Sequence, residues 1–551
     1  MPQIPKFLAV NRRIFIPGLL LLAVLAERAW VLATATPTDF DDAYMFVRYA
    51  NNWLAGHGVA WNPGQAPVYG VTSPLHLIVV TAGRGLFPRM DDASLLRACS
   101  AGAGLLLVLA LAVTCARSSR SPWLRGHVVA WAAGLAVLLG YGEAFLFHAG
   151  TGMDTLLAAL ANTVVLLLAA RLSERPSLGR AAASAIAAYA AVQARPDNVI
   201  VALLCPVLTL ALLSPAPRGR AMALFAGLTT LLLSADVLLK WRFWGTPLPL
   251  AFYTKQPGHY GAFAGEFSWN PLWFLHVFLG ALLPFLLAML LFAGRASLRT
   301  FLVLLVPALL SVAGLFSVNQ IMGHLGRFYF PLLPLFVLAG VRALDDGLRV
   351  LATEQDSTRL ARRLMLRLGL AVLVLSGGSL GLHAAGRAWA ARAPALPEVA
   401  FPRPVPAPTP LPELDSWRAS QEVAQWAASV PAGTRMAMSE HGLVGARARD
   451  AIIIDVLGLH DGVFAHGFRV AELWRRQPDA VWMPHPDHVE MLRQILDSPE
   501  FRRDYLFFPD AFAFGFALRR SSPRFAALSV AFEKRWRAAY PGLRPEDYAA
   551  R

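Results

Sequence analysis

Two adjacent carboxylates, Asp41 and Asp42, follow closely on the first long apolar run of the 551-residue chain. From this pair onward, apolar residues recur at helical spacing over 41–54, while Asp41, Arg48 and Asn52 occupy the opposite face. Such a segment is expected to form an amphipathic helix on the outer surface of a membrane. One carboxylate could act there as a general base that accepts the proton of a hydroxyl group. The alternative is that Asp41 or Asp42 only caps the helix, whose dipole favours negative charge at this end.

A second group consists of charged residues at the expected outer ends of other apolar runs. Cations at this level could hold a phosphate, Arg through paired hydrogen bonds and Lys as a point charge. The alternative for each cation is that it only reaches towards the lipid headgroups. The candidates for phosphate or substrate binding are Arg48, Asp154, Arg195, Asp197, Lys255, His324 and Arg327. Asp154 and Asp197 each begin an apolar run and could equally be helix-start carboxylates, and Asp197 could pair with Arg195.

The composition indicates which elements position these residues. Hydrophobic residues make up 56% of the chain and charged residues 15%, whereas a soluble chain carries roughly 25% charged residues. This excludes an ordinary cytosolic enzyme and a disordered chain. The formal charge of +15 would suggest nucleic acid in a soluble protein. The three cysteines lie in or at the ends of apolar runs, so neither a disulfide nor a metal site is indicated by their spacing.

A spanning helix needs about 20 apolar residues, and about eleven such runs can be placed. They fall near 14–35, 92–115, 128–148, 152–170, 181–194, 198–214, 221–239, 270–293, 301–317, 328–341 and 368–386. Arginines cluster in every second connection, as the positive-inside rule predicts for cytoplasmic loops. We therefore expect the N-terminus inside, the C-terminus outside and no nucleic-acid partner. The first run is too long for a cleavable signal peptide.

The external segments are expected to carry the function. The first, 36–91, should hold the helix at 41–54 and a second juxtamembrane helix of about 14 residues that starts at Thr72-Ser73-Pro74. The predicted organisation is a membrane domain at 1–386, a Pro-rich linker at 387–412 and an external α/β domain at 413–551. Within that last domain we predict helices at 416–430 and 486–496 and strands at 435–439, 451–456 and 479–483.

These segments also carry a family resemblance. The first loop, DDAYMFVRYANNWLAGHGVAWNPG followed by VYGVTSPLH, resembles the acidic-pair region of actinobacterial terminal arabinofuranosyltransferases and of related bacterial proteins annotated for flagellar motor control. Five further segments are similar to that family, in the same order: TGMDTLL (151–157), ARPDN (194–198), RFWGTPLPLAFYTK (242–255), GRFYFPLLP (326–334) and IIDVLGLHD (453–461). The family departs from this chain at 68–76 and at Ser439-Glu440-His441-Gly442, where it shows other residues.

The resemblance implies a type-C glycosyltransferase (GT-C) fold in a bacterial cytoplasmic membrane. The implied reaction moves a sugar, for which the resemblance suggests arabinofuranose, from a polyprenyl-phosphate donor to an extracytoplasmic glycan or protein. Asp41 or Asp42 would be the base, with Asp41 slightly favoured, and Lys255 and Arg327 would hold the phosphate. No cofactor is required, although the adjacent carboxylates could hold a divalent cation.

Two other classes of function remain open at this stage. The first is a non-catalytic assembly factor of the envelope or the flagellar motor, whose external domain binds a partner. The second is a transporter or flippase, against which the lack of inverted repeats counts. A paired carboxylate with interfacial cations favours the enzyme, because a scaffold needs neither.

Overall fold

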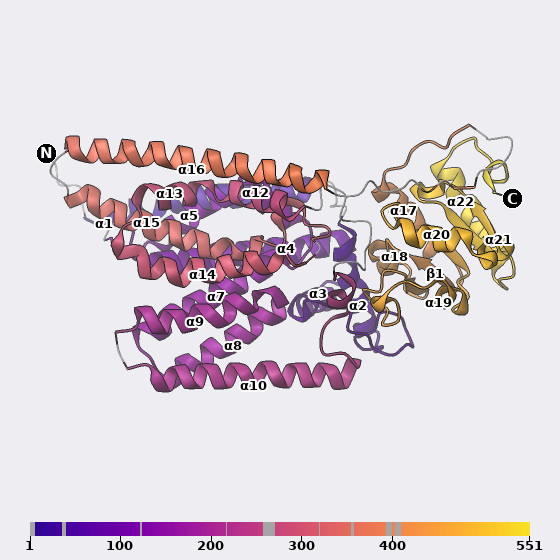
Figure 1. Cartoon of the computed structure of the whole chain (residues 1–551), viewed down its shortest axis with the longest axis horizontal. Helices are drawn as coiled ribbons and strands as arrows, with labels where there is room; N and C mark the ends of the chain where they lie inside the picture. The colour runs from indigo at the N-terminus through magenta and orange to yellow at the C-terminus, as the bar shows by residue number, and fades with distance from the viewer. Residues whose placement is uncertain are drawn as a thin grey trace. The chain divides into compact units, whose positions relative to one another are not determined.

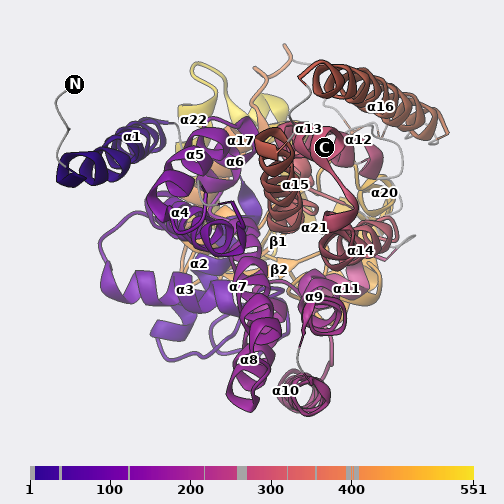
Figure 2. The same ribbon diagram turned by 90° about the vertical axis from the view of Figure 1, so that its left-hand side faces the viewer.

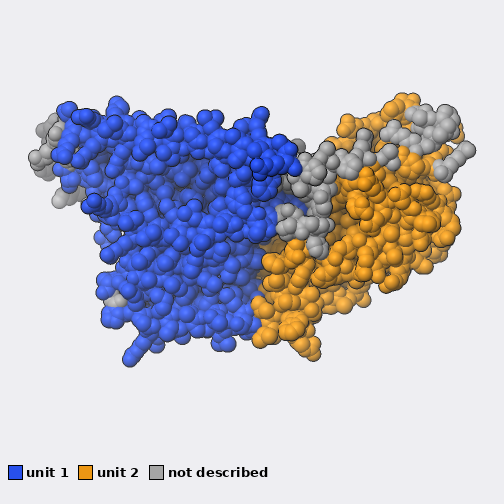
Figure 3. All heavy atoms as spheres, in the orientation of Figure 1, with its two compact units in different colours: residues 1–38, 97–236, 266–392 blue, residues 39–96, 237–265, 393–551 orange. Residues whose placement is uncertain are grey.

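The computed structural model describes residues 6–35, 40–121, 124–215, 217–256, 270–318, 320–353, 357–392, 399, 401–402 and 409–550. The chain divides into two compact units, coloured separately in Figure 3. Unit 1 comprises residues 1–38, 97–236 and 266–392, and unit 2 comprises residues 39–96, 237–265 and 393–551. The first external loop therefore belongs to the same compact unit as the C-terminal part of the chain. The predicted domains are continuous stretches of sequence and place this loop in the membrane domain at 1–386. Those boundaries stay a prediction, and most of the Pro-rich linker lies outside the described residues.

Unit 1 is built from long apolar helices (Figure 1). Its helices, with α4 and α10 continuing into unit 2, are α1 (Lys6–Thr34), α4 (Asp92–Ser118), α5 (Val128–Gly140), α6 (Glu143–Gly150), α7 (Thr155–Glu174), α8 (Leu178–Ala194), η1 (Pro196–Asn198), α9 (Val199–Leu213), α10 (Gly219–Trp244), α12 (Pro271–Ala281), α13 (Leu283–Phe292), η3 (Arg295–Ser297), α14 (Leu298–Leu315), η4 (His324–Gly326), η5 (Phe330–Leu332), α15 (Leu333–Thr353) and α16 (Ser357–Ala391).

By length and composition, eight helices in the described residues can cross a membrane, or up to ten if each bent pair is one span. These ten match ten of the predicted runs, so the polytopic helical fold with a C-terminal α/β part is confirmed. The remaining run, at 181–194, is the 17-residue helix α8, which is short for a crossing. Two predicted runs are not continuous: α5 and α6 meet at 88° beside Gly142, and α12 and α13 meet at 70° beside Pro284.

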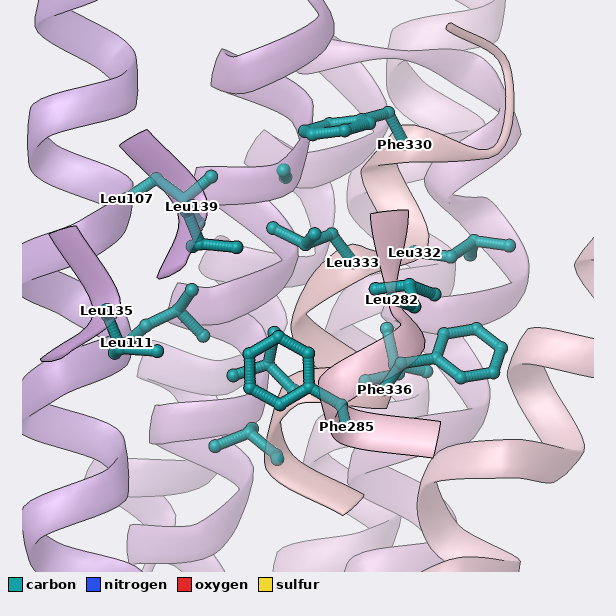
Figure 4. Close-up of a cluster of buried hydrophobic side chains, with 14 of the residues drawn as sticks. Leu107, Leu111, Leu135, Leu139, Leu282, Phe285, Phe330, Leu332, Leu333 and Phe336 are labelled. Atoms are coloured by element: carbon teal, nitrogen blue, oxygen red, sulfur yellow. The ribbon is translucent and has the colours of Figure 1, made fainter. Parts of the chain in front are cut away.

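The core of unit 1 gathers around α15. About 94% of the span that contains α15 is buried, against 6% for the spans in α1 and α16 and 11% for α10. Figure 2 shows α10 and α16 at the periphery of this unit. Leucine and phenylalanine side chains of α4, α5, α13 and α15 fill the core, as Figure 4 shows for Leu107, Leu135, Phe285 and Phe336. The most exposed helices therefore present apolar side chains outward, as lipid contact requires.

The arginine-rich connections lie together at one end of unit 1. A cavity of about 240 Å³ is lined by the C-terminal ends of α4, α7 and α9 and by residues of α14 and α15. The Asp345 carboxylate of α15 accepts hydrogen bonds from the backbone N–H groups of Arg120 (2.9 Å) and Ser121 (2.7 Å) in the connection after α4. This common end agrees with the alternation of arginine clusters in the sequence. Its cytoplasmic placement stays a prediction.

Unit 2 contains a five-stranded sheet of order β2-β1-β3-β5-β4. Strands β1 (Arg435–Met438), β2 (Ile452–Asp455) and β3 (Ala480–Trp482) are parallel, and β5 (Phe516–Arg519) pairs antiparallel with β3 and with β4 (Tyr505–Phe508). The other elements of the C-terminal part are α17 (Ser416–Ala427), α18 (Gly442–Arg447), η6 (Phe464–His466), α19 (Val470–Arg475), α20 (Val489–Asp497), α21 (Pro499–Asp504), η7 (Ala511–Ala513), α22 (Phe525–Ala539) and η8 (Pro545–Tyr548). The three predicted strands and two predicted helices are confirmed, whereas β4 and β5 were not predicted.

The first external loop supplies α2 (Asp41–Leu54) and α3 (Pro74–Leu86), and residues 237–256 supply α11 (Leu250–Thr254). Both predicted loop helices are confirmed, and α3 is 13 residues long. The polar face of α2 is buried. Asp41, Arg48 and Asn52 are buried, at 8%, 2% and 5% exposed, because this face packs against α18 and against the loop that follows α2.

Candidate functional site

The carboxylate of Asp41 lies at the N-terminus of α18. Its Oδ2 accepts a hydrogen bond from the backbone N–H of Gly442 (2.7 Å), and its Oδ1 accepts one from Leu443 (2.8 Å). These two N–H groups have no partner within their own helix, so the carboxylate satisfies both. Position 442 must be glycine, because a Cβ there would overlap the backbone oxygen of Asp41. Asp41 is thus fixed by a segment 400 residues away in the sequence.

Arg48 binds the opposite end of the same short helix. Its Nη1 donates to the carbonyl oxygens of Gly445 (2.6 Å) and Ala448 (3.0 Å). Its Nη2 donates to the Ala451 carbonyl (2.9 Å) and to Asn62 Oδ1 (2.8 Å), and its Nε donates to the Trp61 carbonyl (2.6 Å).

These contacts use as many acceptors as a guanidinium has N–H groups, five. Asp41 and Arg48 therefore place opposite charges at the two ends of α18, in the sense that its dipole favours. The prediction that Arg48 binds a phosphate stays a prediction, and the guanidinium has a structural role in this conformation.

The N-terminus of α18 lies at the topological switch point of the sheet. After β1 the chain forms β2 on one side of β1 and then β3 on the other side, and both pair parallel to β1. In open α/β sheets, ligands bind outside the carboxyl ends of the strands at such a point. Glu440 and His441 follow β1, Asp455 ends β2, and His485 follows β3. The structure thus adds titratable side chains to the Asp41 region.

Glu440 lies within the electrostatic influence of Asp41. Burial, and then the charge of Asp41, raise the pKa of the Glu440 carboxyl to about 7. Burial also raises the pKa of Asp41, while the hydrogen bond from the Leu443 amide and the charge of His441 act in the opposite direction. A carboxylate with a raised pKa is a stronger base than an exposed one, which suits proton abstraction near neutral pH.

Three potential metal ligands lie close together at the carboxyl ends of β1 and β2. His441, Asp455 and His460 each offer one atom, and these atoms lie within 4.8 Å of one another. All three side chains are buried, at 1%, 0% and 4% exposed. Among the described residues, one group of three or more His, Cys, Asp or Glu side chains could hold a metal ion, and it is this one. Asp41 and Asp42 do not belong to it, so a divalent cation at that pair stays a prediction.

In unit 1, Arg195 pairs with Asp197, as one of the predicted alternatives had it, and also with Asp154. Its Nη1 pairs with Asp154 Oδ1 (3.3 Å), and its Nη2 pairs with Asp197 Oδ2 (2.9 Å). Arg195 and Asp154 are buried, at 7% and 2% exposed. Asp154 directly precedes α7, so the two carboxylates hold the guanidinium at the N-terminal end of this helix. The arginine-rich connection follows the C-terminal end of the same helix.

Arg327 lies near Arg195. The guanidinium carbon of Arg195 lies 5.4 Å from the centre of the Phe328 ring, and that of Arg327 lies 5.8 Å from the same centre. Two predicted phosphate ligands of unit 1 are therefore brought together around one aromatic ring. His324 begins η4, three residues before Arg327. Lys255 follows α11 and is partly buried in unit 2.

Sequence reasoning did not assign a role to Glu440, His441 or His460. The signal was present, since the strands predicted at 435–439 and 451–456 were each followed closely by polar residues. Carboxyl ends of adjacent parallel strands meet at one edge of a sheet, so these residues could have been grouped. Their meeting with α2 could not have been inferred, because about 400 residues separate the partners.

Comparison with known proteins gives a limited result. No protein-family model matches the sequence, and the search of curated proteins returned no match. Among solved structures, the crystal structure of ArnT from Cupriavidus metallidurans bound to undecaprenyl phosphate aligns with 91% of this chain and 98% of its own chain, with a TM-score of 0.48 and 14% sequence identity. A likeness of this degree assigns neither a family nor an activity to the chain.

Proposed function

We propose that this multi-pass membrane protein is a glycosyltransferase that moves a sugar from a polyprenyl-phosphate donor to an extracytoplasmic glycan or protein. The observation that carries the proposal is the fixed, buried carboxylate of Asp41, held by the amides of Gly442 and Leu443. A transferase needs a positioned base for the acceptor hydroxyl, and the raised pKa of Asp41 suits that task. Asp42, the next residue on α2, is the alternative base.

The leaving group of this reaction is a lipid phosphate, which cations stabilise. We propose this task for Arg327 and Arg195 of unit 1, which share the Phe328 ring. His324 of unit 1 and Lys255 of unit 2 are further candidates from their predicted positions at the outer ends of spans. Asp154 and Asp197 contribute by orienting Arg195. Arg48 contributes by holding α18, and hence Asp41, in place. The step needs no cofactor.

The proposed donor sugar is arabinofuranose, on the basis of the first-loop sequence and the five ordered segments that resemble the arabinofuranosyltransferases. The proposed location is a bacterial cytoplasmic membrane, with the arginine-rich end of unit 1 inside and unit 2 outside. This orientation is supported by Arg120 and Arg342, which line one cavity together with the C-terminal ends of α7 and α9.

The double variant Asp41→Asn/Asp42→Asn tests the proposal in cells. We expect it to insert into the membrane and to lose transfer of the sugar to the envelope by about 100-fold or more, since a general base contributes about that much. Asp450→Asn, which alters an exposed carboxylate of the same unit, is the matched control and should retain transfer. Undiminished transfer by the double variant would exclude the proposed base and favour the assembly-factor alternative.

A further inference from the structure

The buried side chains of His441, Asp455 and His460 lie at the carboxyl edge of the parallel part of the sheet. His441 follows β1, Asp455 is the last residue of β2, and His460 lies in the turn after β2. One potential ligand atom from each lies within 4.8 Å of the other two. Since all three are more than nine-tenths buried, water contributes little to balancing their polarity.

His441 has the hydrogen-bonding pattern of a metal-binding imidazole. Its Nδ1 lies 2.6 Å from the carbonyl oxygen of Ser439, to which only an N–H can donate. A metal-bound histidine usually donates its other ring N–H to a carbonyl or carboxylate in this way, which fixes the tautomer. The second nitrogen, Nε2, is buried without a hydrogen-bond partner among the described residues. A neutral ring in this position therefore offers its lone pair on Nε2.

The other two side chains are held in fixed orientations. Asp455 accepts hydrogen bonds from the backbone N–H groups of Leu457 (2.9 Å), Gly458 (3.2 Å) and His460 (2.6 Å). The His460 ring stacks on Trp61, with ring centres 4.0 Å apart and planes at 13°.

The ring nitrogens of His460 lie 3.0 Å from the Tyr49 hydroxyl and 2.9 Å from Met45 Sδ. Both nitrogens therefore contact another side chain, and a metal ion bound by His460 takes the place of the Tyr49 hydroxyl or of Met45 Sδ at one of them.

Carboxylates lie close to this place. His441 Nδ1 lies 3.7 Å from Asp455 Oδ1, and the Asp41 carboxylate binds the amides of the two residues that follow His441. The Arg48 guanidinium is bound to the carboxyl end of α18. Nearby negative charge of this kind favours a metal cation.

We propose that His441, Asp455 and His460 bind a divalent transition-metal ion, with Zn²⁺ as the best match. Two imidazoles and one carboxylate are a donor set that suits zinc, whereas Ca²⁺ and Mg²⁺ take oxygen ligands. The ion ties the turn after β1 to the end of β2. Since Gly442 and Leu443 follow His441 directly, it also fixes the two amides that hold Asp41.

The test measures metal content and stability and does not depend on transfer activity, so its failure is distinct from failure of the proposed function. The full chain is purified in detergent with a tag that contains no histidine and is supplied with zinc. After dialysis, elemental analysis should find about one zinc ion per chain. His441→Gln and His460→Gln should each lose most of this zinc. His488→Gln, which alters a buried histidine of the same sheet edge, is the matched control and should keep it.

A second measurement on the unaltered chain covers the case in which a variant fails to fold. A zinc chelator should lower the Tm by several degrees, and added zinc should restore it while added magnesium should not. Zinc binding should weaken as the pH falls, because protons compete for the imidazole nitrogens. The proposal is overturned if the unaltered chain retains no stoichiometric zinc and its Tm does not respond to zinc. It is also overturned if His488→Gln loses zinc as fully as His441→Gln does.

Discussion

At the scale of single residues, Arg48 shows how a correct sequence pattern can leave a role undecided. The helical spacing placed Arg48 on the same face as Asp41, and the structure confirms the helix. The pattern could not show what covers that face, because the acceptors of Arg48 include carbonyls 397 to 403 residues further along the chain. A basic residue near an acidic pair then suggested phosphate binding, whereas Arg48 donates to four backbone carbonyls and to the side chain of Asn62.

Replacing Arg48 by lysine separates these two roles. Arg48→Lys keeps the charge but cannot reach five acceptors, so buried carbonyls lose their donors. We expect the free energy of unfolding of unit 2 to fall by about 2–4 kcal/mol. Thermal unfolding of the full chain measures this change, with the exposed Arg449 as control (Arg449→Lys). An unchanged Tm together with weaker donor binding would instead support the phosphate role.

Glu440 gives the site a pH-dependent stability. The ordinary pKa of 4.5 is raised to about 7 by burial and by Asp41. The unfolded chain therefore releases this proton at lower pH than the folded chain does. The stabilising contribution is complete below about pH 4.5 and is lost as the pH rises through about 7.

We expect Glu440→Gln to become more stable than the unaltered chain as the pH rises between about 5 and 8, by about 1–3 kcal/mol. Tm values measured across that range provide the check, with Glu490→Gln as the exposed control on α20. A difference that stays constant with pH would show that Glu440 is not responsible for this dependence.

At the scale of elements, α18 is the part that joins α2 to the sheet. Both of its ends are bound by side chains of α2, and Gly442 permits the approach. The sequence predicted the strands on either side of α18 from a β-branched run at Ile452–Ile454 and from short apolar runs near 435 and 480. It did not predict α18 itself, since a six-residue helix is too short to show a periodic pattern.

The close contact at Gly442 leads to a test of this element. In Gly442→Ala, the added methyl group would overlap the backbone of Asp41 and push α18 away from α2. We expect a loss of about 2–3 kcal/mol in unfolding free energy, together with reduced transfer, because the amides no longer hold the carboxylate. Gly462→Ala is the matched control, since no atom lies within 4 Å of a Cβ at that position. Equal Tm values for the two variants would contradict the close packing of α2 on α18.

At the scale of the whole molecule, the positions of apolar runs and arginines along the chain predicted the membrane topology, which the overall composition could not do. Hydropathy located ten spans that the structure confirms by length and composition, and the arginine clusters predicted the connections that gather at one end of unit 1. Hydropathy cannot reveal that a span is bent, so the breaks at Gly142 and Pro284 were not foreseen. Nor can it reveal that residues 39–96 form a compact unit with residues 393–551, because that grouping depends on contacts between distant segments.

The central claim is that this chain transfers a sugar from a lipid phosphate with a carboxylate of α2 as base. The most direct measurement incubates the purified full chain with polyprenyl-phosphate sugars, arabinofuranose among them, and follows release of the polyprenyl phosphate by mass spectrometry. We expect turnover by the unaltered chain, and a loss of about 100-fold or more in Asp41→Asn, with a smaller loss in Asp42→Asn. The absence of turnover with every donor, or equal turnover by the unaltered chain and the Asp41→Asn/Asp42→Asn variant, would contradict the claim.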